Sequence, residues 1–220
     1  MPNFQQLTPE YFEKRRAELA AQFPGAKFGW YGNADALEAL QSALVAGGEE
    51  AIQQTLTANP YLIQYAVDRS GHHGIWVFPK QMIKPRSADG SQGLIPDYLI
   101  VTRSSLGYFW HIVELKRADL QFANQKGDGF SSEGGRAIAQ CNAYLTHFQD
   151  YIDAIRSHIR VAELIQPEGV VLLMGDSETE SEAQRKFRSD FVRNNSKITV
   201  VTYRRIIASL ESDLRSRAGG

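Results

Sequence analysis

Three ionisable residues stand at the ends of two neighbouring predicted strands. Asp97 follows Pro96 at the start of one strand, and Glu114 and Lys116 lie at the end of the next. Because residues two apart in a strand point to the same side, Glu114 and Lys116 share a face. In an antiparallel hairpin the start of the first strand lies beside the end of the second. The pattern therefore predicts that Asp97 lies close to Glu114 and Lys116.

This set of side chains suits metal-assisted hydrolysis of a phosphodiester. Two carboxylates supply the hard oxygen donors that Mg²⁺ or Mn²⁺ prefers. A lysine beside a metal-bound water can orient or deprotonate that nucleophile, or stabilise charge on a phosphate. An isolated pattern of this kind is common by chance, so a bland alternative is open. In that alternative Asp97 is a turn residue at the entry to its strand, and Glu114 and Lys116 form a solvated edge pair or a structural ion pair.

A polar pair, Gln140 and Tyr144, lies on a predicted helix that follows the hairpin. The two residues are one helical turn apart and are expected on the flank of an apolar stripe, where they can face the carboxylates. Taken alone, the pair could equally make ordinary boundary contacts. The stripe itself has spacings of three and four and predicts one continuous helix with a core cysteine: Ile138, Cys141, Leu145, Phe148, Ile152, Ile155 and Ile159.

The elements that must position these groups can be placed by period and by capping residues. Thr8, Asn33 and Glu49 are expected to open three helices, and Asn59 before Pro60 is expected to end the third. Strands are expected at residues 75–78, 81–83, 98–102, 108–116, 169–174 and 198–203, and later helices after Gly135, at about 181–194 and beyond residue 203. This order predicts an α/β fold with one mixed sheet and helices on both faces.

Both strands of the hairpin are apolar on both faces, which favours a central place in the sheet. We expect a helical segment at residues 1–45 ahead of a main domain at residues 46–220.

Composition narrows the possible partners. The chain has 220 residues, with 24 Lys and Arg against 25 Asp and Glu, for a net charge of -1. A uniformly basic nucleic-acid coat is excluded, so contact with nucleic acid must come from local patches or a bound cation. A single cysteine excludes a disulfide within the chain and cysteine-based zinc sites. The absence of a secretory signal and of a membrane-length apolar run predicts a cytoplasmic protein with no membrane contact.

Other chemistry-bearing residues carry less weight. His72 and His73 lack adjacent further ligands for zinc and are expected to form a loop pair. His111 points opposite to Glu114 by strand parity and is expected to be packed. The glycine-rich loop at residues 127–129 lacks the ending of a phosphate-binding P-loop, so no nucleotide cofactor is expected. Lys126 and Arg136 flank this loop and could contact DNA phosphates, although a solvated surface role is equally compatible.

The order Pro96-Asp97, Glu114-x-Lys116 and Gln140-xxx-Tyr144 resembles the PD-(D/E)xK nuclease superfamily, and the helix pair resembles its RecB-like branch. More narrowly, the chain is similar to the Shedu family of bacterial anti-phage nucleases over roughly residues 49–207. The supporting segments are residues 49–60, 169–175 and 200–203. The resemblance implies a restriction-endonuclease-like core.

The resemblance also implies roles for residues of the hairpin. It implies that Asp97 and Glu114 are ligands of Mg²⁺ or Mn²⁺, with the backbone carbonyl of Leu115 completing the ligand set. Lys116 is implied to position or activate the attacking water.

Helical residues receive implied roles as well. Gln140 is implied to orient Lys116 or the scissile phosphate, and Tyr144 to support it and lie at the DNA together with Arg136 and Lys126. The superfamily often adds a glutamate from the helix before the sheet. We choose Glu49 over Glu50 because Glu49 shares the face of Ile52 and Leu56.

The leading hypothesis is thus a Mg²⁺-dependent DNA endonuclease that acts in anti-phage defence and forms a homo-oligomer. The alternative is a catalytically silent nuclease-fold module that binds nucleic acid ends or a partner protein. The intact set of Asp97, Glu114 and Lys116 argues against the silent module, which has no need of it. A purely structural oligomerisation domain is the third hypothesis.

Overall fold

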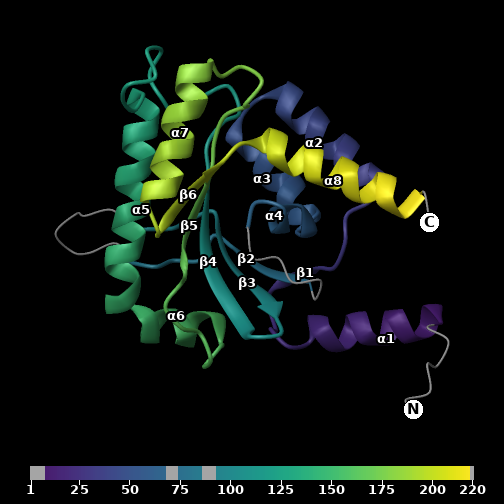
Figure 1. Ribbon diagram of the computed structural model, residues 1–220. Helices are drawn as coiled ribbons and strands as arrows, with labels where there is room; N and C mark the ends of the chain where they lie inside the picture. Colours follow the sequence, from purple (N-terminus) through teal and green to yellow (C-terminus); the bar gives the residue numbers. More distant parts are fainter. Residues whose placement is uncertain (1–7, 68–73, 86–92, 219–220) are drawn as a thin grey trace.

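A mixed sheet of six strands, in the spatial order β1-β2-β3-β4-β5-β6, forms the middle layer of the protein (Figure 1). The computed structural model describes residues 8–67, 74–85 and 93–218. The strands from β1 to β4 pair antiparallel, whereas β4, β5 and β6 are parallel. Their bounds are β1 Lys27–Gly29, β2 Ile75–Pro79, β3 Tyr98–Ser104, β4 Gly107–Leu115, β5 Gly169–Leu173 and β6 Ile198–Val201.

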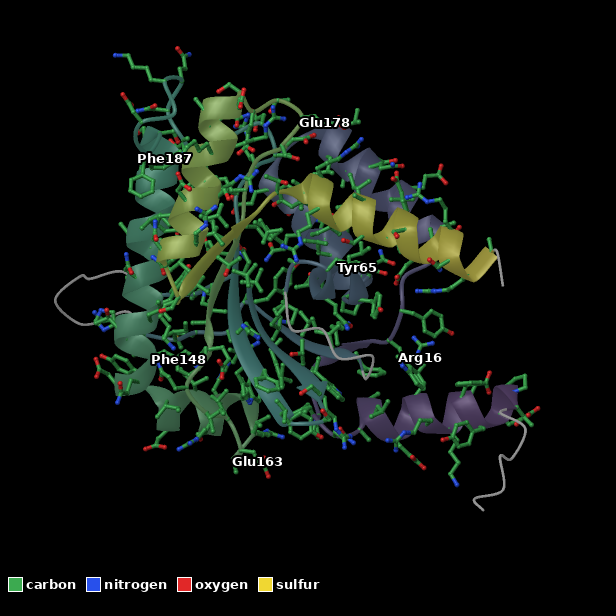
Figure 2. All side chains as sticks on the ribbon, viewed as in Figure 1. Arg16, Tyr65, Phe148, Glu163, Glu178 and Phe187 are labelled. Carbon is green, nitrogen blue, oxygen red and sulfur yellow. The ribbon has the colours of Figure 1, made fainter. Side chains whose placement is uncertain are left out.

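Helices cover both faces of this sheet, so the predicted α/β fold is confirmed. On one face lie α5 (Ser132–Asp150), α6 (Ile152–Ile159) and α7 (Glu182–Asn194). On the other lie α2 (Ala34–Ala46), α3 (Glu49–Ala58), α4 (Tyr61–Gln64) and α8 (Tyr203–Ala218). Phe148 of α5 and Tyr65, just after α4, mark these two opposite layers in Figure 2. Each layer buries its own apolar core against the sheet.

The predicted hairpin is confirmed as β3 and β4. Its register pairs Tyr98 with Val113 and runs to Ser104 opposite Gly107. Both strands are central in the sheet, as their apolar composition predicted. Extending the register by one residue from the Tyr98–Val113 pair places Asp97 opposite Glu114. The two carboxylates therefore leave the sheet at the same end.

Two predictions about elements were wrong, and one strand was not predicted. Residues 81–83 are not a strand, because the chain leaves the sheet after Pro79 and then forms an isolated bridge between Lys84 and Leu94. β1 was not predicted, since three residues are too few to show an alternating pattern. The expected single helix is divided into α5 and α6 at Tyr151, whose ψ of 11° departs from helical geometry. The apolar stripe continues across that break.

Tyr144 lies at the centre of the buried stripe of α5, not on its flank as predicted. The buried positions of this helix are Gly134, Ala137, Cys141, Tyr144 and Phe148. The ring of Tyr144 is only 1% exposed, which its bonded hydroxyl permits. Cys141 is buried as predicted, and burial raises the pKa of its thiol to about 12.

The N-terminal residues join the same sheet and core. Thr8 caps α1 (Pro9–Ala20) and Asn33 caps α2, as predicted. β1 pairs with β2, and Leu40 of α2 is fully buried. The division at residues 45 and 46 stays a prediction. No helix among the residues that the structure describes is both long enough and apolar enough to cross a membrane.

Gly134 lets α5 approach the segment that follows β4. A Cβ atom at Gly134 would lie 2.1 Å from the carbonyl oxygen of Phe122, whereas one at Gly135 would meet nothing closer than 3.8 Å. We expect Gly134→Ala to lower the free energy of unfolding by about 2 kcal/mol or more. Gly135→Ala is the matched control and should leave it unchanged or raise it by up to about 1 kcal/mol, because alanine favours the helix. Urea denaturation measures both, and equal effects of the two substitutions would contradict this packing.

Candidate active site

A row of charged residues crosses the end of the central strands. The ladder pairs Pro79 with Tyr98 and Tyr98 with Val113, so the next positions are Lys80, Asp97 and Glu114. The backbone N–H of Lys80 donates to the carbonyl oxygen of Asp97 at 2.9 Å, which continues the ladder to this point. Residues opposite one another across a sheet share a face. Sequence reasoning predicted the neighbourhood of Asp97 and Glu114 but missed Lys80.

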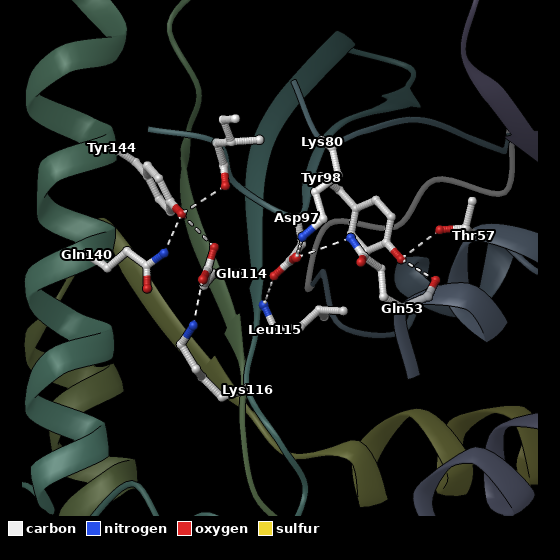
Figure 3. A network of polar contacts seen from close by, with 11 residues as sticks. Gln53, Thr57, Lys80, Asp97, Tyr98, Glu114, Leu115, Lys116, Gln140 and Tyr144 are labelled. Carbon is white, nitrogen blue, oxygen red and sulfur yellow. Dashed lines mark hydrogen bonds and ion pairs between the residues drawn. The ribbon is translucent and has the colours of Figure 1, made fainter. Parts of the chain in front are cut away.

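Asp97 is held by donors from three different elements (Figure 3). Its Oδ2 accepts a hydrogen bond from the backbone N–H of Leu115 at 2.7 Å. Its Oδ1 accepts one from Gln53 Nε2 of α3 at 3.2 Å and forms an ion pair with Lys80. The residue is only 3% exposed. The carboxylate is therefore buried and fixed in direction.

Glu114 is equally buried and is held by two side chains. Its Oε1 accepts a hydrogen bond from Lys116 Nζ at 2.7 Å, and its Oε2 accepts one from the Tyr144 hydroxyl at 2.8 Å. Burial raises the pKa of Glu114, and the nearby charge of Asp97 raises it further, while Lys116 and Tyr144 act in the opposite direction. Two buried carboxylates thus lie close enough for the charge of one to raise the pKa of the other, an arrangement that a bound cation would stabilise.

Lys116 follows β4 directly and is anchored at both its backbone and its ammonium group. Its backbone N–H donates to Leu173 of β5 at 2.8 Å, and its carbonyl accepts from the hydroxyl of buried Tyr203 at 2.8 Å. Burial alone lowers the pKa of the Lys116 ammonium, but Glu114, Glu49 and Asp97 outweigh it and raise the pKa overall. Lys116 is therefore a charged hydrogen-bond donor in this structure.

Gln140 and Tyr144 of α5 hold Glu114 through two successive hydrogen bonds. Gln140 Nε2 donates to the Tyr144 hydroxyl at 2.6 Å, and that hydroxyl donates to Glu114. Burial raises the pKa of Tyr144, so the phenol keeps its proton and remains a donor. Tyr144 was predicted to contact DNA, but its ring is buried, which does not favour such a contact. Its contacts instead orient a carboxylate.

Helix α3 turns Glu49 and Gln53 toward the same site. Glu49 is half-buried, and burial raises its pKa; Lys116 and Lys80 lower it, and Asp97 raises it. Glu50 is exposed and accepts a hydrogen bond from Gln54. The choice of Glu49 over Glu50 agrees with this placement, while its catalytic role stays a prediction. Gln53 lies one turn beyond Glu49 and could have been found by that spacing.

The donor set fits a hard divalent cation with few protein ligands. The described residues contain no group of three or more His, Cys, Asp and Glu side chains that could hold a metal ion. Mg²⁺ keeps several waters and is commonly bound through one or two carboxylates, so Asp97 and Glu114 suffice. The N–H of Leu115 points at Asp97. Since both polar groups of a strand residue point to the same neighbour, the Leu115 carbonyl lies on that side too.

The other predicted residues lie outside this network of contacts. Arg136 is exposed, one turn before Gln140, and pairs with Glu133 at 2.8 Å. Lys126 is exposed in the glycine-rich loop. This loop packs closely on α7, since a Cβ atom added at Gly127 would lie 2.6 Å from the Cβ atom of Ala183. DNA contact by either cation stays a prediction. His111 is buried, as predicted, and the pair at residues 72–73 lies outside the described residues.

Comparison with protein families now adds evidence beyond the geometry. A family model for the C-terminal part of the Shedu protein SduA matches residues 47–207. This span contains every residue of the network described above, from Glu49 to Tyr203. A search of curated proteins finds no match. The predicted resemblance to the Shedu family is confirmed, and the PD-(D/E)xK assignment, which rests on the Asp97, Glu114 and Lys116 pattern, stays an inference. Because the match spans well over half of its length, the chain belongs to the Shedu family.

Proposed function

We propose that this protein is a metal-dependent endonuclease that hydrolyses DNA backbone phosphodiesters in defence against phage. Membership of the Shedu family suggests a defence-related nuclease. One observation carries the finer proposal. Asp97 and Glu114 are each 3% exposed and lie one residue beyond the Tyr98–Val113 pair that ends the β3–β4 register, and Lys116 is bonded to Glu114.

The proposed cation is Mg²⁺ or Mn²⁺, held by Asp97, Glu114 and the carbonyl of Leu115. When bound it would polarise a phosphate oxygen and lower the pKa of an attacking water. The support for this site is electrostatic. Burial of two like charges is costly unless a cation compensates them, and the two lysines at hand are each bonded to one carboxylate only.

Each remaining residue has a role that follows from its contacts. The Lys116 ammonium, held by Glu114, is placed to orient the attacking water or to donate to a phosphate oxygen. Tyr203 fixes the Lys116 backbone, and Tyr144 with Gln140 fixes Glu114. These are positioning residues, because they act through the groups that would meet the substrate.

DNA is the proposed partner even though the chain carries a net charge of -1. A bound cation together with Lys116 would counter the phosphate charge locally. Arg136, in the second turn of α5, and Lys126, in the loop before that helix, are exposed and are proposed to contact flanking phosphates. Assembly as a homo-oligomer stays a prediction of the family resemblance.

Cleavage of supercoiled plasmid tests the proposal. Wild-type protein should cut the plasmid with Mg²⁺ or Mn²⁺ and not with EDTA. Asp97→Ala and Lys116→Ala should each reduce the rate by about a hundredfold or more, since each removes a metal ligand or a donor to the reacting groups. Lys14→Ala, on exposed α1, is the charge-matched control for Lys116→Ala and should keep wild-type activity. Metal-independent cutting, or full activity in Asp97→Ala, would refute the assignment. No cutting of plasmid, linear, single-stranded or RNA substrates would favour the binding-module alternative.

Tyr144→Phe separates a positioning role from direct DNA contact. The substitution keeps the buried ring and removes the hydroxyl that holds Glu114 and accepts from Gln140. We expect kcat to fall by about tenfold, with little change in KM for DNA. Tyr108→Phe is the matched control, because its hydroxyl bonds Gln22 at the opposite end of β4. A raised KM with unchanged kcat would instead restore the role at the DNA.

A further inference from the structure

Lys80 carries an ion pair that the predicted catalytic pattern does not include. Its ammonium contacts Oδ1 of Asp97, the carboxylate proposed to hold the divalent cation. The two partners differ sharply in environment, since the Lys80 side chain is 52% exposed and that of Asp97 is 3% exposed. The buried Asp97 carboxylate is thus paired with a lysine whose side chain is half exposed to solvent.

The backbone fixes Lys80 at this place. Lys80 directly follows β2 and has a φ of 51°, in the left-handed region that a lysine rarely adopts. Its N–H nevertheless bonds the Asp97 carbonyl at 2.9 Å, so the ladder sets its position opposite Asp97. A strained residue kept directly opposite a buried carboxylate points to a role at that carboxylate.

The hydrogen bonds of Asp97 show which of its partners can leave. A carboxylate offers about four lone-pair directions, and here three donors use them. The Leu115 N–H belongs to a central strand and cannot move away. Gln53 is uncharged, and the Tyr98 hydroxyl holds its backbone carbonyl at 2.7 Å. The half-exposed Lys80 ammonium can return to water at the least cost.

Lys116 provides the contrast within the same site. Its side chain is 17% exposed and its backbone is bonded on both sides, so it stays beside Glu114. A divalent cation on Asp97 would repel the nearby Lys80 ammonium and occupy its direction on the carboxylate.

We infer that Lys80 is the counter-ion of Asp97 in the metal-free protein and is displaced when the divalent cation binds. Lys80 therefore competes with the metal for Asp97 and sets the concentration of metal at which the site fills. This inference rests on the metal site of the proposed function.

Binding of Mn²⁺, followed by electron paramagnetic resonance without DNA, tests the competition. Lys80→Met keeps the stem and removes the charge, so the dissociation constant should fall by about tenfold. Lys80→Arg keeps a positive charge, and arginine binds carboxylates firmly. The dissociation constant of this variant for Mn²⁺ should therefore equal or exceed the wild-type value. Lys14→Met, which removes the same charge far from the site, should match wild type.

Thermal unfolding gives a second readout. In EDTA, Lys80→Met should melt below wild type because Asp97 loses its counter-ion, and saturating Mn²⁺ should close that gap. If Lys80→Met fails to fold, Lys80→Arg still decides, since tighter Mn²⁺ binding by that variant contradicts competition.

The outcomes separate this inference from the proposed function. If wild type binds Mn²⁺, Asp97→Ala abolishes that binding and Lys80→Met binds no more tightly, Lys80 is not a competitor and the metal site stands. If Asp97→Ala binds Mn²⁺ as wild type does, or wild type binds none, both the metal site and the role of Lys80 are refuted.

Discussion

The β3–β4 hairpin brings two carboxylates of like charge to the same buried end of the sheet. The contacts around them offset the cost of burying and repelling these charges. Asp97 and Glu114 lie at the same end of the sheet, and the charge of Asp97 raises the pKa of Glu114. The side chains bonded to these carboxylates each contribute a donor or a positive charge: Lys80 and Gln53 to Asp97, Lys116 and Tyr144 to Glu114. Both layers of helices supply these groups, α3 from one face and α5 from the other.

Glu180 shows what a structural buried charge looks like in the same protein. It is 6% exposed, and Arg188 neutralises it with two hydrogen bonds of 2.8 and 2.6 Å. One anion there meets one bidentate cation. At the sheet end, by contrast, the three carboxylates of Asp97, Glu114 and Glu49 lie near only two lysines among the described residues, Lys80 and Lys116. This difference favours a functional explanation over the structural ion pair that the sequence alone left open.

Local patterns carried the parts of the fold and site that could be predicted. Two apolar runs joined by a tight turn specify a hairpin, and strand parity then brings Asp97 to Glu114. Helix spacing likewise predicted that Glu49 faces the sheet, because it shares a helix face with Ile52 and Leu56. Tyr144 was misplaced because its hydroxyl marked it as a boundary residue, although a buried phenol is tolerated once its hydroxyl is bonded. The break at Tyr151 escaped because the apolar stripe runs through it.

The missed residues depend on contacts between distant segments. Lys80 reaches Asp97 because of the register between β2 and β3. Residues 80–96 connect these strands, and a connection of that length gives no sequence rule from which the register could be predicted. Tyr203 reaches Lys116 from the start of α8, a sequence separation of 87 residues. No local spacing encodes either contact.

An anomalous difference map from crystals soaked in Mn²⁺ tests the central claim most directly. We expect one peak bonded to carboxylate oxygens of both Asp97 and Glu114, with the Lys80 ammonium withdrawn from Asp97. Ordered carboxylates with no peak between them, or a peak bound elsewhere, would contradict it.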